Sequence, residues 1–144
     1  MATFVLFHEA MFNIGSGAID LDSHTFKAVL SNVAPVQATS DELADITQIA
    51  NGNGYTTGGV TLSGVTWSES GAGTGIWIFT SSDFSWTASG GSIATFQYVV
   101  IYSDTSTGDK LLGYFDYGAA VNITNGNTFN ADVQAAGLAQ FTVT

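Results

Sequence analysis

Residues 93–144 read IATFQYVVIYSDTSTGDKLLGYFDYGAAVNITNGNTFNADVQAAGLAQFTVT, a stretch in which apolar, β-branched runs alternate with short turn sequences. The runs cover residues 96–102, 111–117, 128–133 and 138–143. The segments between them are rich in Asp, Asn and Gly, which tolerate the backbone angles of tight turns. This alternation predicts four antiparallel strands joined by hairpins. We expect the four strands to form the core of one β-sandwich.

The composition agrees with one mainly β domain. The chain has 144 residues, of which 45% are hydrophobic and only 10% are charged, whereas an ordinary globular protein has about 25% charged residues. A chain of this length buries enough surface to form a core without disulfides or metals, and this one has no cysteine. The high apolar fraction also indicates that a partner covers part of the surface.

The charge balance excludes several classes of partner. The chain has 12 acidic residues, two lysines (Lys27 and Lys110) and no arginine, with a formal net charge of −10. Nucleic acids and anionic membranes are bound by clusters of Lys and Arg, so we expect neither as a partner. No apolar run approaches the ~20 residues of a membrane span, and residues 1–10 lack the basic region of a secretory signal peptide. We therefore expect synthesis in the cytoplasm.

The N-terminal segment has large apolar residues at helical spacing. They are Phe4, Phe7, Met11 and Phe12. Their spacing predicts a helix over residues 3–14 within an N-terminal helical arm, residues 1–17, that precedes a single β-sandwich domain over residues 18–144. Two roles for the helix stay open: it packs on its own domain, or it packs on a neighbouring subunit.

The middle of the chain adds one strand, one short helix and three further strands. Residues 24–31 alternate polar and apolar side chains, which predicts a strand with one buried face. Residues 40–50 begin with Ser40 as a candidate N-cap and continue with acidic residues, which predicts a short helix. Three more strands are expected at residues 60–67, 75–80 and 83–88. The whole pattern is typical of an antiparallel, jelly-roll-like sandwich with an N-terminal helix and one short helix.

Candidate catalytic motifs are weak. Asp22, Ser23 and His24 contain the residue types of a hydrolase triad, but consecutive strand residues point to opposite faces and do not align. The glycine-rich residues 51–59 lack the Lys and the following helix of a phosphate-binding loop. We therefore expect these residues to have structural roles.

The carboxylates and possible metal ligands also indicate structural roles. Acidic pairs at residues 41–42 and at positions 104 and 109 fall at a helix start and in a loop, where acids occur for capping and turn formation. Neither DLD at residues 20–22 nor residues 104–109 match a spaced calcium loop, and two histidines without cysteine make a poor zinc site. We expect no enzyme, no metal site and no cofactor.

From residue 18 onward, short motifs follow one another in a distinctive order. They are DLD at 20–22, HTFKAVL at 24–30, the segment 42–50, NGY at 53–55, DFSWTA at 83–88, YVVIY at 98–102, LLGYFDYG at 111–118 and NTFN at 127–130. In this order they resemble a family of small proteins encoded among the head genes of tailed bacteriophages. Members of that family commonly have an Arg near residues 95–97, and this chain has none.

The resemblance implies a protein that coats or cements the capsid shell, as a homotrimer with a jelly-roll-like sandwich. It implies two partners, the chain itself and the major capsid protein, and a location on the exterior of the virion capsid. The family brings no catalytic residues. Large aromatic and apolar residues are the types that anchor protein contacts, so we predict an oligomer or capsid interface at Phe4, Phe7, Met11, Phe12 and Tyr55.

Two alternatives stay open. The first is a tail or fibre knob that binds a receptor glycan. A sugar platform needs at least one exposed aromatic ring, so the exposure of Trp67, Trp77 and Trp86 bears on it. The second is a hydrolase that degrades cell-wall polymers, which requires an activity that is lost on substitution of one acidic residue.

Overall fold

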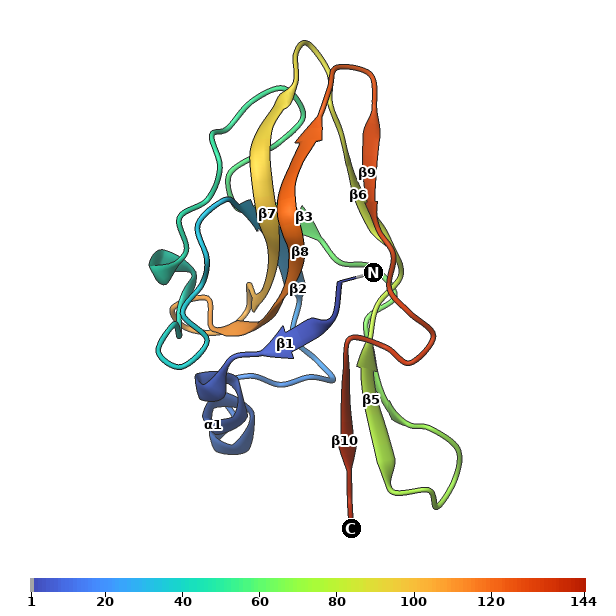
Figure 1. The fold of residues 1–144 in the computed structure, drawn as a ribbon. Helices are drawn as coiled ribbons and strands as arrows, with labels where there is room; N and C mark the ends of the chain where they lie inside the picture. The colour runs from blue at the N-terminus through green and yellow to red at the C-terminus, as the bar shows by residue number, and fades with distance from the viewer. Residues whose placement is uncertain (1) are drawn as a thin grey trace.

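The computed structural model describes residues 2–144, which form a mainly β protein with three antiparallel sheets and one α-helix (Figure 1). The strands are β1 (Phe4–Leu6), β2 (Phe26–Ser31), β3 (Val60–Thr61), β4 (Thr66–Glu69), β5 (Ile76–Thr80), β6 (Phe84–Thr87), β7 (Ile93–Ser103), β8 (Leu111–Ile123), β9 (Thr128–Ala131) and β10 (Ala139–Thr142). The helical elements are α1 (His8–Ser16) and the single 3₁₀ turn η1 (Leu43–Asp45). The sheet orders are β1-β8-β7-β2-β3, β10-β5-β4 and β6-β9.

The longest strands, β7 and β8, form the central hairpin of the five-stranded sheet. They pair in antiparallel register, with Val99 opposite Phe115 and Val100 opposite Tyr114. The ladder shifts register between Phe96 and Tyr98, and such bulges increase the local bend and twist of a strand. The sequence-based prediction of strands over 96–102 and 111–117 is confirmed, and both strands continue beyond those limits.

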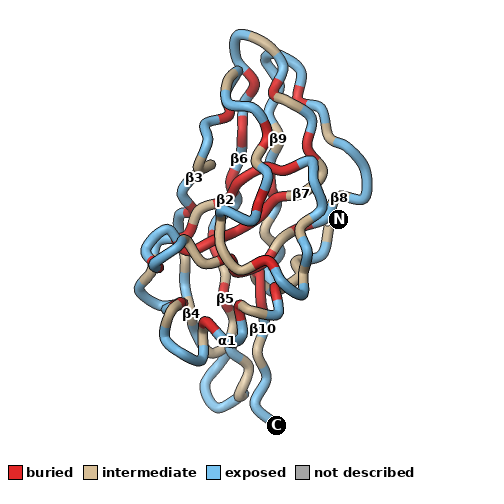
Figure 2. The backbone as a smooth tube through the Cα atoms, turned by 90° about the vertical axis from the view of Figure 1, so that its left-hand side faces the viewer, coloured by how far each residue is buried: buried red, intermediate tan, exposed pale blue. Residues whose placement is uncertain are grey.

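Strand β2 lies between β7 and β3, and both of its faces are buried. Ala28, Val29 and Leu30 have no exposed surface, so the prediction of a strand with one buried face is wrong. The two small sheets lie on one side of the large sheet, and residues 32–59 run along the other side (Figure 1). Buried positions gather where these layers meet (Figure 2). A strand covered on both faces is apolar on both, because neither face meets water.

The last two strands do not continue the hairpin series. β9 pairs with β6 and β10 pairs with β5, so the prediction that all four C-terminal strands are joined by hairpins is wrong after β8. This pairing places Phe129 against Phe96, with ring centroids 5.0 Å apart. Similarly, Phe79 of β5 packs on Phe26 of β2 at 4.8 Å. These aromatic contacts join both small sheets to the large one and explain why the chain leaves the hairpin order.

The helix predicted over residues 3–14 is not present with those bounds. Its first part is strand β1, which pairs with β8 and sets Phe4 opposite Phe115. The one α-helix starts after Phe7, whose backbone is extended, and ends at Gly17 in the left-handed conformation. A three-residue segment forms a strand here because an open sheet edge on β8 satisfies its backbone groups.

The short helix predicted over residues 40–50 is also wrong. Only the single turn η1 forms there, closed by a capping box between Glu42 and Asp45. The following residues are extended, with a bridge between Ser31 and Gln48 and a hydrogen bond from Ile49 N to the Leu30 oxygen at 3.0 Å. A helix of about ten residues is marginal, and the β2 backbone offers hydrogen bonds to the extended form.

Of the remaining strand predictions, two are confirmed and one is wrong in its bounds. β5 and β6 confirm the strands expected at residues 75–80 and 83–88. The strand expected over residues 60–67 is two strands, β3 and β4, in two different sheets. The chain passes from one sheet to the other near Gly64, whose φ of 60° lies in the left-handed region.

Candidate binding surface

The five residues predicted as an interface separate into two groups. Phe7 and Tyr55 belong to the core, with 0% and 1% exposure, and Phe4 is half-buried on Phe115 with ring centroids 5.1 Å apart. Met11 and Phe12 are exposed at 50% and 69%. In the isolated chain only these last two have much side-chain surface left to bury against another subunit.

The orientation of α1 explains this division. Ala10 and Asn13, three residues apart, are the buried residues of the helix and mark its inward face. Met11 and Phe12 fall on the outward side. Asn13 is held by its amide, which donates to the Asp41 carboxylate at 2.7 Å. Met11 and Phe12 therefore face solvent, whereas Ala10, Asn13 and the partly buried Ile14 face the protein, so the helix has large apolar residues on both sides and is not simply amphipathic.

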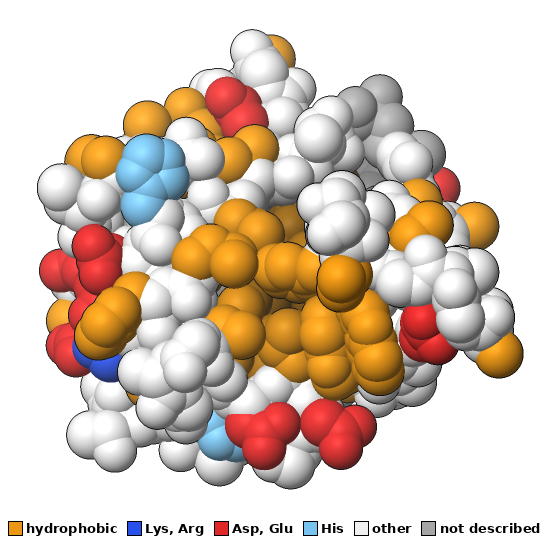
Figure 3. All heavy atoms as spheres, turned by 90° about the horizontal axis from the view of Figure 1, so that it is seen from below, with side chains coloured by type: hydrophobic (Ala, Val, Ile, Leu, Met, Phe, Trp, Pro, Cys, Tyr) orange, Lys and Arg blue, Asp and Glu red, His pale blue; other side chains and the backbone are white. Residues whose placement is uncertain are grey.

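An apolar groove lies beside the end of α1. Its lining residues are Ile14, Gly17, Ile19, Asp20, Leu21 and Trp67, and its volume is about 290 Å³. The view from below shows apolar side chains gathered in a hollow on this underside, with acidic side chains near its edge (Figure 3). The sequence did not predict this groove, because its walls come from the end of α1, the segment after it and β4, about 50 residues later.

The wall contributed by the β10-β5-β4 sheet is aromatic. Trp67 lies 5.5 Å from Trp77 and 5.4 Å from Phe141, measured between ring centroids. Strand register puts the three rings on one face of that sheet, because Trp77 is opposite both Phe141 and Glu69. Trp77 is 37% exposed and Trp67 is half-buried, whereas Trp86 is buried at 2%. The exposed ring of Trp77 therefore lies on the same sheet face as Trp67, which lines the groove.

The two carboxylates near this aromatic face are hydrogen-bonded within the chain. Asp20 accepts from the amides of Asp22 and Ser23 at 2.9 and 3.2 Å and from the Ser23 hydroxyl at 2.7 Å. The Ser23 hydroxyl, with the Asp22 amide, lowers the pKa of Asp20 below its ordinary value. Glu69 accepts from the amides of Gly73 and Gly75 at 3.1 and 2.8 Å. Both carboxylates thus accept hydrogen bonds from the turns in which they lie.

The residue types of a hydrolase triad do not come together. The Ser23 hydroxyl donates to Asp20, and the His24 Nδ1 lies 2.8 Å from the hydroxyl of Ser103. Ser103 is fully buried and accepts a hydrogen bond from the Ser106 amide at 3.2 Å. A nucleophile must reach a substrate, and the buried Ser103 does not. The pair is therefore a structural contact between the segment before β2 and the end of β7.

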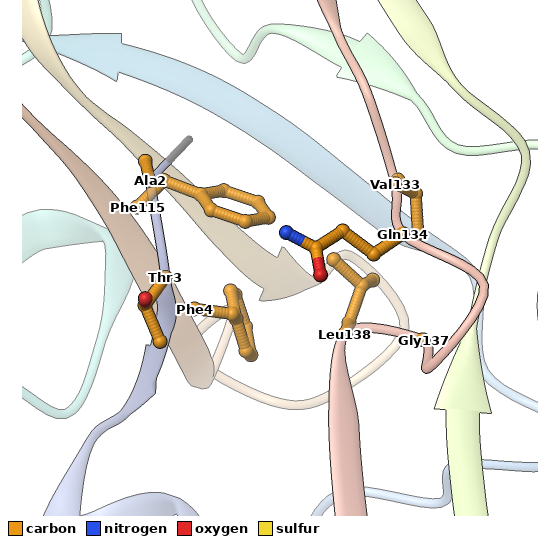
Figure 4. A pocket seen from close by; sticks show the side chains of 8 residues that line it. All are labelled: Ala2, Thr3, Phe4, Phe115, Val133, Gln134, Gly137 and Leu138. Atoms are coloured by element: carbon orange, nitrogen blue, oxygen red, sulfur yellow. The ribbon is translucent and has the colours of Figure 1, made fainter.

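Two other hollows are present. A polar one of about 450 Å³ is lined in part by His24, Glu42 and Lys110, and the Lys110 amine there is already paired with Asp41 and Glu42. A small one of about 140 Å³ lies between the N-terminal segment and the start of β10. In it the Gln134 amide points between Phe115 and Leu138 (Figure 4). In the larger hollow the Ser106 hydroxyl donates to the Ser103 carbonyl oxygen at 2.8 Å.

Buried phenols offer no acid–base group near neutral pH. Burial raises the pKa of Tyr55 and of Tyr102 to about 12, and their hydroxyls donate to Gln48 at 2.7 Å and to the Gly58 oxygen at 2.8 Å. Within residues 2–144, no group of three His, Asp or Glu side chains is placed to hold a metal ion. Nor does that part of the chain contain a helix long and apolar enough to cross a membrane.

Comparison with known proteins gives no relative: no family model, curated protein or solved structure matches this chain.

Proposed function

We propose that this protein is a structural protein of a tailed-phage virion, a capsid decoration or cement protein without enzymatic activity. On this proposal the chain is made in the host cytoplasm and forms a homotrimer. It binds the major capsid protein on the exterior of the capsid. The order of motifs from residue 18 onward is what points to phage heads. The proposal includes a jelly-roll-like sandwich, with the five-stranded sheet as one layer and the two small sheets as the other.

The observation that carries the proposal is the exposed apolar surface on α1 and on the β10-β5-β4 sheet. Met11, Phe12 and Trp77 are exposed in the isolated chain, and the apolar groove lies between α1 and Trp67. Stable protein contacts bury ~1,200–2,000 Å² in total and are anchored by large apolar side chains. A cement protein with such anchors binds across capsomer boundaries and stabilises the assembled shell, because it binds that state alone.

A second candidate is a receptor-binding or glycan-binding knob of the phage tail. The exposed ring of Trp77, stacked near Trp67, favours it, because sugars bind against exposed aromatic faces. Its weakness is the state of the nearby carboxylates, since Asp20 and Glu69 already accept hydrogen bonds from their own turns. The capsid role uses the same apolar rings without requiring free acceptors.

Immunogold electron microscopy of the phage particles tests the proposal. Antibody against this protein should place gold over the heads, and pre-immune serum on the same grid preparation is the control. Gold confined to tails or necks would contradict the capsid role and favour the receptor-binding candidate. Particles without gold, under conditions in which antibody to the major capsid protein labels them, would contradict both.

A further inference from the structure

We propose that the groove beside α1 binds one apolar side chain of another protein, presented by a segment that carries Lys or Arg next to it. This proposal rests on the proposed function, and it names the chemistry of the capsid-protein segment that the chain would recognise. The groove is lined by Ile14, Gly17, Ile19, Asp20, Leu21 and Trp67.

The lining of the groove favours an apolar occupant. Of its six lining residues, Ile14, Ile19 and Leu21 are aliphatic and a fourth is the half-buried Trp67. The volume of about 290 Å³ is at the lower limit of ordinary ligand pockets, which suits one or two side chains. The carboxylate of Asp20, the one charged group in the lining, accepts three hydrogen bonds from its own turn. A sugar has a hydroxyl on most of its carbons and would leave them unpaired against aliphatic walls.

The electrostatics favour a basic occupant. The chain has a net charge of −10, and both of its lysines are engaged in ion pairs: Lys27 with Asp104, and Lys110 with Asp41 and Glu42. Asp20 lines the groove, and Glu69 shares a sheet face with Trp67. A segment with Lys or Arg beside its apolar anchor meets attraction along this surface, whereas an acidic segment meets repulsion.

The same charges disfavour a second copy of this chain as the occupant. The exposed large apolar residues of α1 are Met11 and Phe12, and Glu9 lies on the same short helix. Inserting that helix into the groove of a neighbour brings the acidic Glu9 close to a groove whose one charged lining residue is Asp20. A basic segment of another protein meets no such repulsion.

The test uses two short peptides that differ only in charge, acetyl-Lys-Gly-Phe-Gly-Lys-amide and acetyl-Glu-Gly-Phe-Gly-Glu-amide. Each is titrated into the ¹⁵N-labelled full chain, and the three tryptophan indole N–H signals are followed by NMR. The Lys peptide should shift the Trp67 signal saturably and leave that of the buried Trp86 in place. The Glu peptide should bind at least about fivefold more weakly at low salt, with a difference that shrinks as salt is added.

Two variants on α1 provide a matched comparison. Ile14→Lys puts a cation into the groove wall and should abolish the Trp67 shift, whereas Phe12→Lys makes the same charge change outside the lining and should leave it intact. Asp20→Asn keeps an acceptor for the turn but removes the charge, and it should weaken the Lys peptide about two- to threefold and strengthen the Glu peptide to a similar extent. Urea unfolding of each variant confirms that it is folded.

Several results would overturn the proposal. Equal binding of the two peptides would contradict a preference for a basic partner. The absence of a Trp67 shift with both peptides would show that the groove is not a binding site. A larger Trp67 shift with maltohexaose than with the Lys peptide would assign the surface to glycans. A Trp67 shift that appears on concentrating the protein alone, and that Ile14→Lys and Phe12→Lys both abolish, would assign the groove to α1 of a second copy.

These results are independent of the microscopy. Peptide binding, together with phage heads that carry no gold, would support the groove as a binding site and contradict the capsid role. Gold over the heads without peptide binding would support the capsid role and contradict the groove as a binding site.

Discussion

Lys110 joins three parts of the chain that are distant in sequence. Its amine donates to the carboxylates of Asp41 and Glu42, the second at 2.9 Å, and Asp41 in turn accepts from the buried amide of Asn13. One lysine thus holds α1, the turn before η1 and the end of the β7–β8 loop together. Lys27 makes a looser pair, 3.6 Å from Asp104. The two lysines of the chain are therefore a natural pair for comparison.

Replacing Lys110 by Met should lower the free energy of unfolding by about 1–2 kcal/mol, because the half-buried Asp41 loses a charged hydrogen-bond partner. The matched variant Lys27→Met removes the same charge from a single, longer and more exposed pair, and should cost less than about 0.5 kcal/mol. Urea unfolding at pH 7 measures both. Equal losses for the two variants would mean that Lys110 acts only through the net charge.

Asp45 is held in its charged form by backbone amides. Its carboxylate accepts from the amides of Asp41 and Glu42 at 2.9 and 3.1 Å, and these hydrogen bonds lower its pKa below the ordinary value of 3.8. A carboxylate whose pKa is lower in the folded state adds stability above its unfolded pKa. That stability is lost as the pH falls through the folded pKa.

Asp45→Asn should therefore be less stable than the parent chain at pH 7, and this difference should shrink as the pH falls from about 5 to about 2. Asn keeps an oxygen for the amides but has no charge, so it isolates the ionisation. The measurement is the urea midpoint at several pH values. Asp22→Asn is the control, since Asp22 is exposed and lies outside this turn. A parallel pH dependence in Asp45→Asn and the parent chain would contradict the assignment.

At the scale of elements, the sequence predicts the structure best where the pairing is local. β7 and β8 are long apolar runs joined by a short loop with Gly108 and Asp109 at positive φ, so their turn chemistry and their pairing lie in one stretch of about 30 residues. The same reasoning identifies β5, β6, β9 and β10 as strands. It does not identify their partners, because the β6–β9 and β5–β10 pairs join segments that are distant in the sequence.

The N-terminal segment was the least predictable for the same reason. Phe4 and Phe7 have the spacing of a helix, yet Phe4 lies on a strand whose partner, Phe115, is more than 100 residues away. A three-residue edge strand is too short to show the period of two that distinguishes strands. The candidate site is similar: the sequence predicts Met11 and Phe12 as interface residues from their types, whereas the groove depends on the packing of α1 beside β4.

The junction between β2 and β3 depends on a close backbone approach. Gly59 has a φ of 76°, and a Cβ atom there would lie 1.8 Å from the Ala28 carbonyl oxygen. Gly59→Ala should therefore lower the free energy of unfolding by roughly 3 kcal/mol, because the strand must move away from Ala28. Gly126→Ala is the matched control. It has a similar φ of 87° but open space around the Cβ position, and should cost about 1 kcal/mol.

Urea unfolding distinguishes the two glycine variants. Similar losses at both positions would mean that positive φ alone, and not the contact with Ala28, requires glycine at position 59.

At the scale of the whole molecule, the proposed trimer combines an apolar contact with strong self-repulsion. Each subunit has a net charge of −10, while Met11 and Phe12 offer the apolar surface on α1. Neither residue contributes to the core, so the double variant Met11→Ser/Phe12→Ser should unfold at nearly the same urea concentration as the parent chain. In mass photometry it should shift from trimer to monomer. A trimer that survives this change would place the interface elsewhere.

Salt should strengthen the trimer. Bringing three chains of charge −10 together costs repulsion that counterions screen, whereas the apolar contact is little affected by moderate salt. Raising NaCl from about 0.02 M to about 0.3 M, which shortens the screening length several-fold, should therefore lower the concentration at which the trimer dissociates. Contact with a basic capsid segment should respond in the opposite direction, because screening weakens attraction between unlike charges. Measuring both dissociation constants over the same salt series separates the two contacts: a trimer weakened by salt would mean that subunits associate through charge pairs rather than through α1.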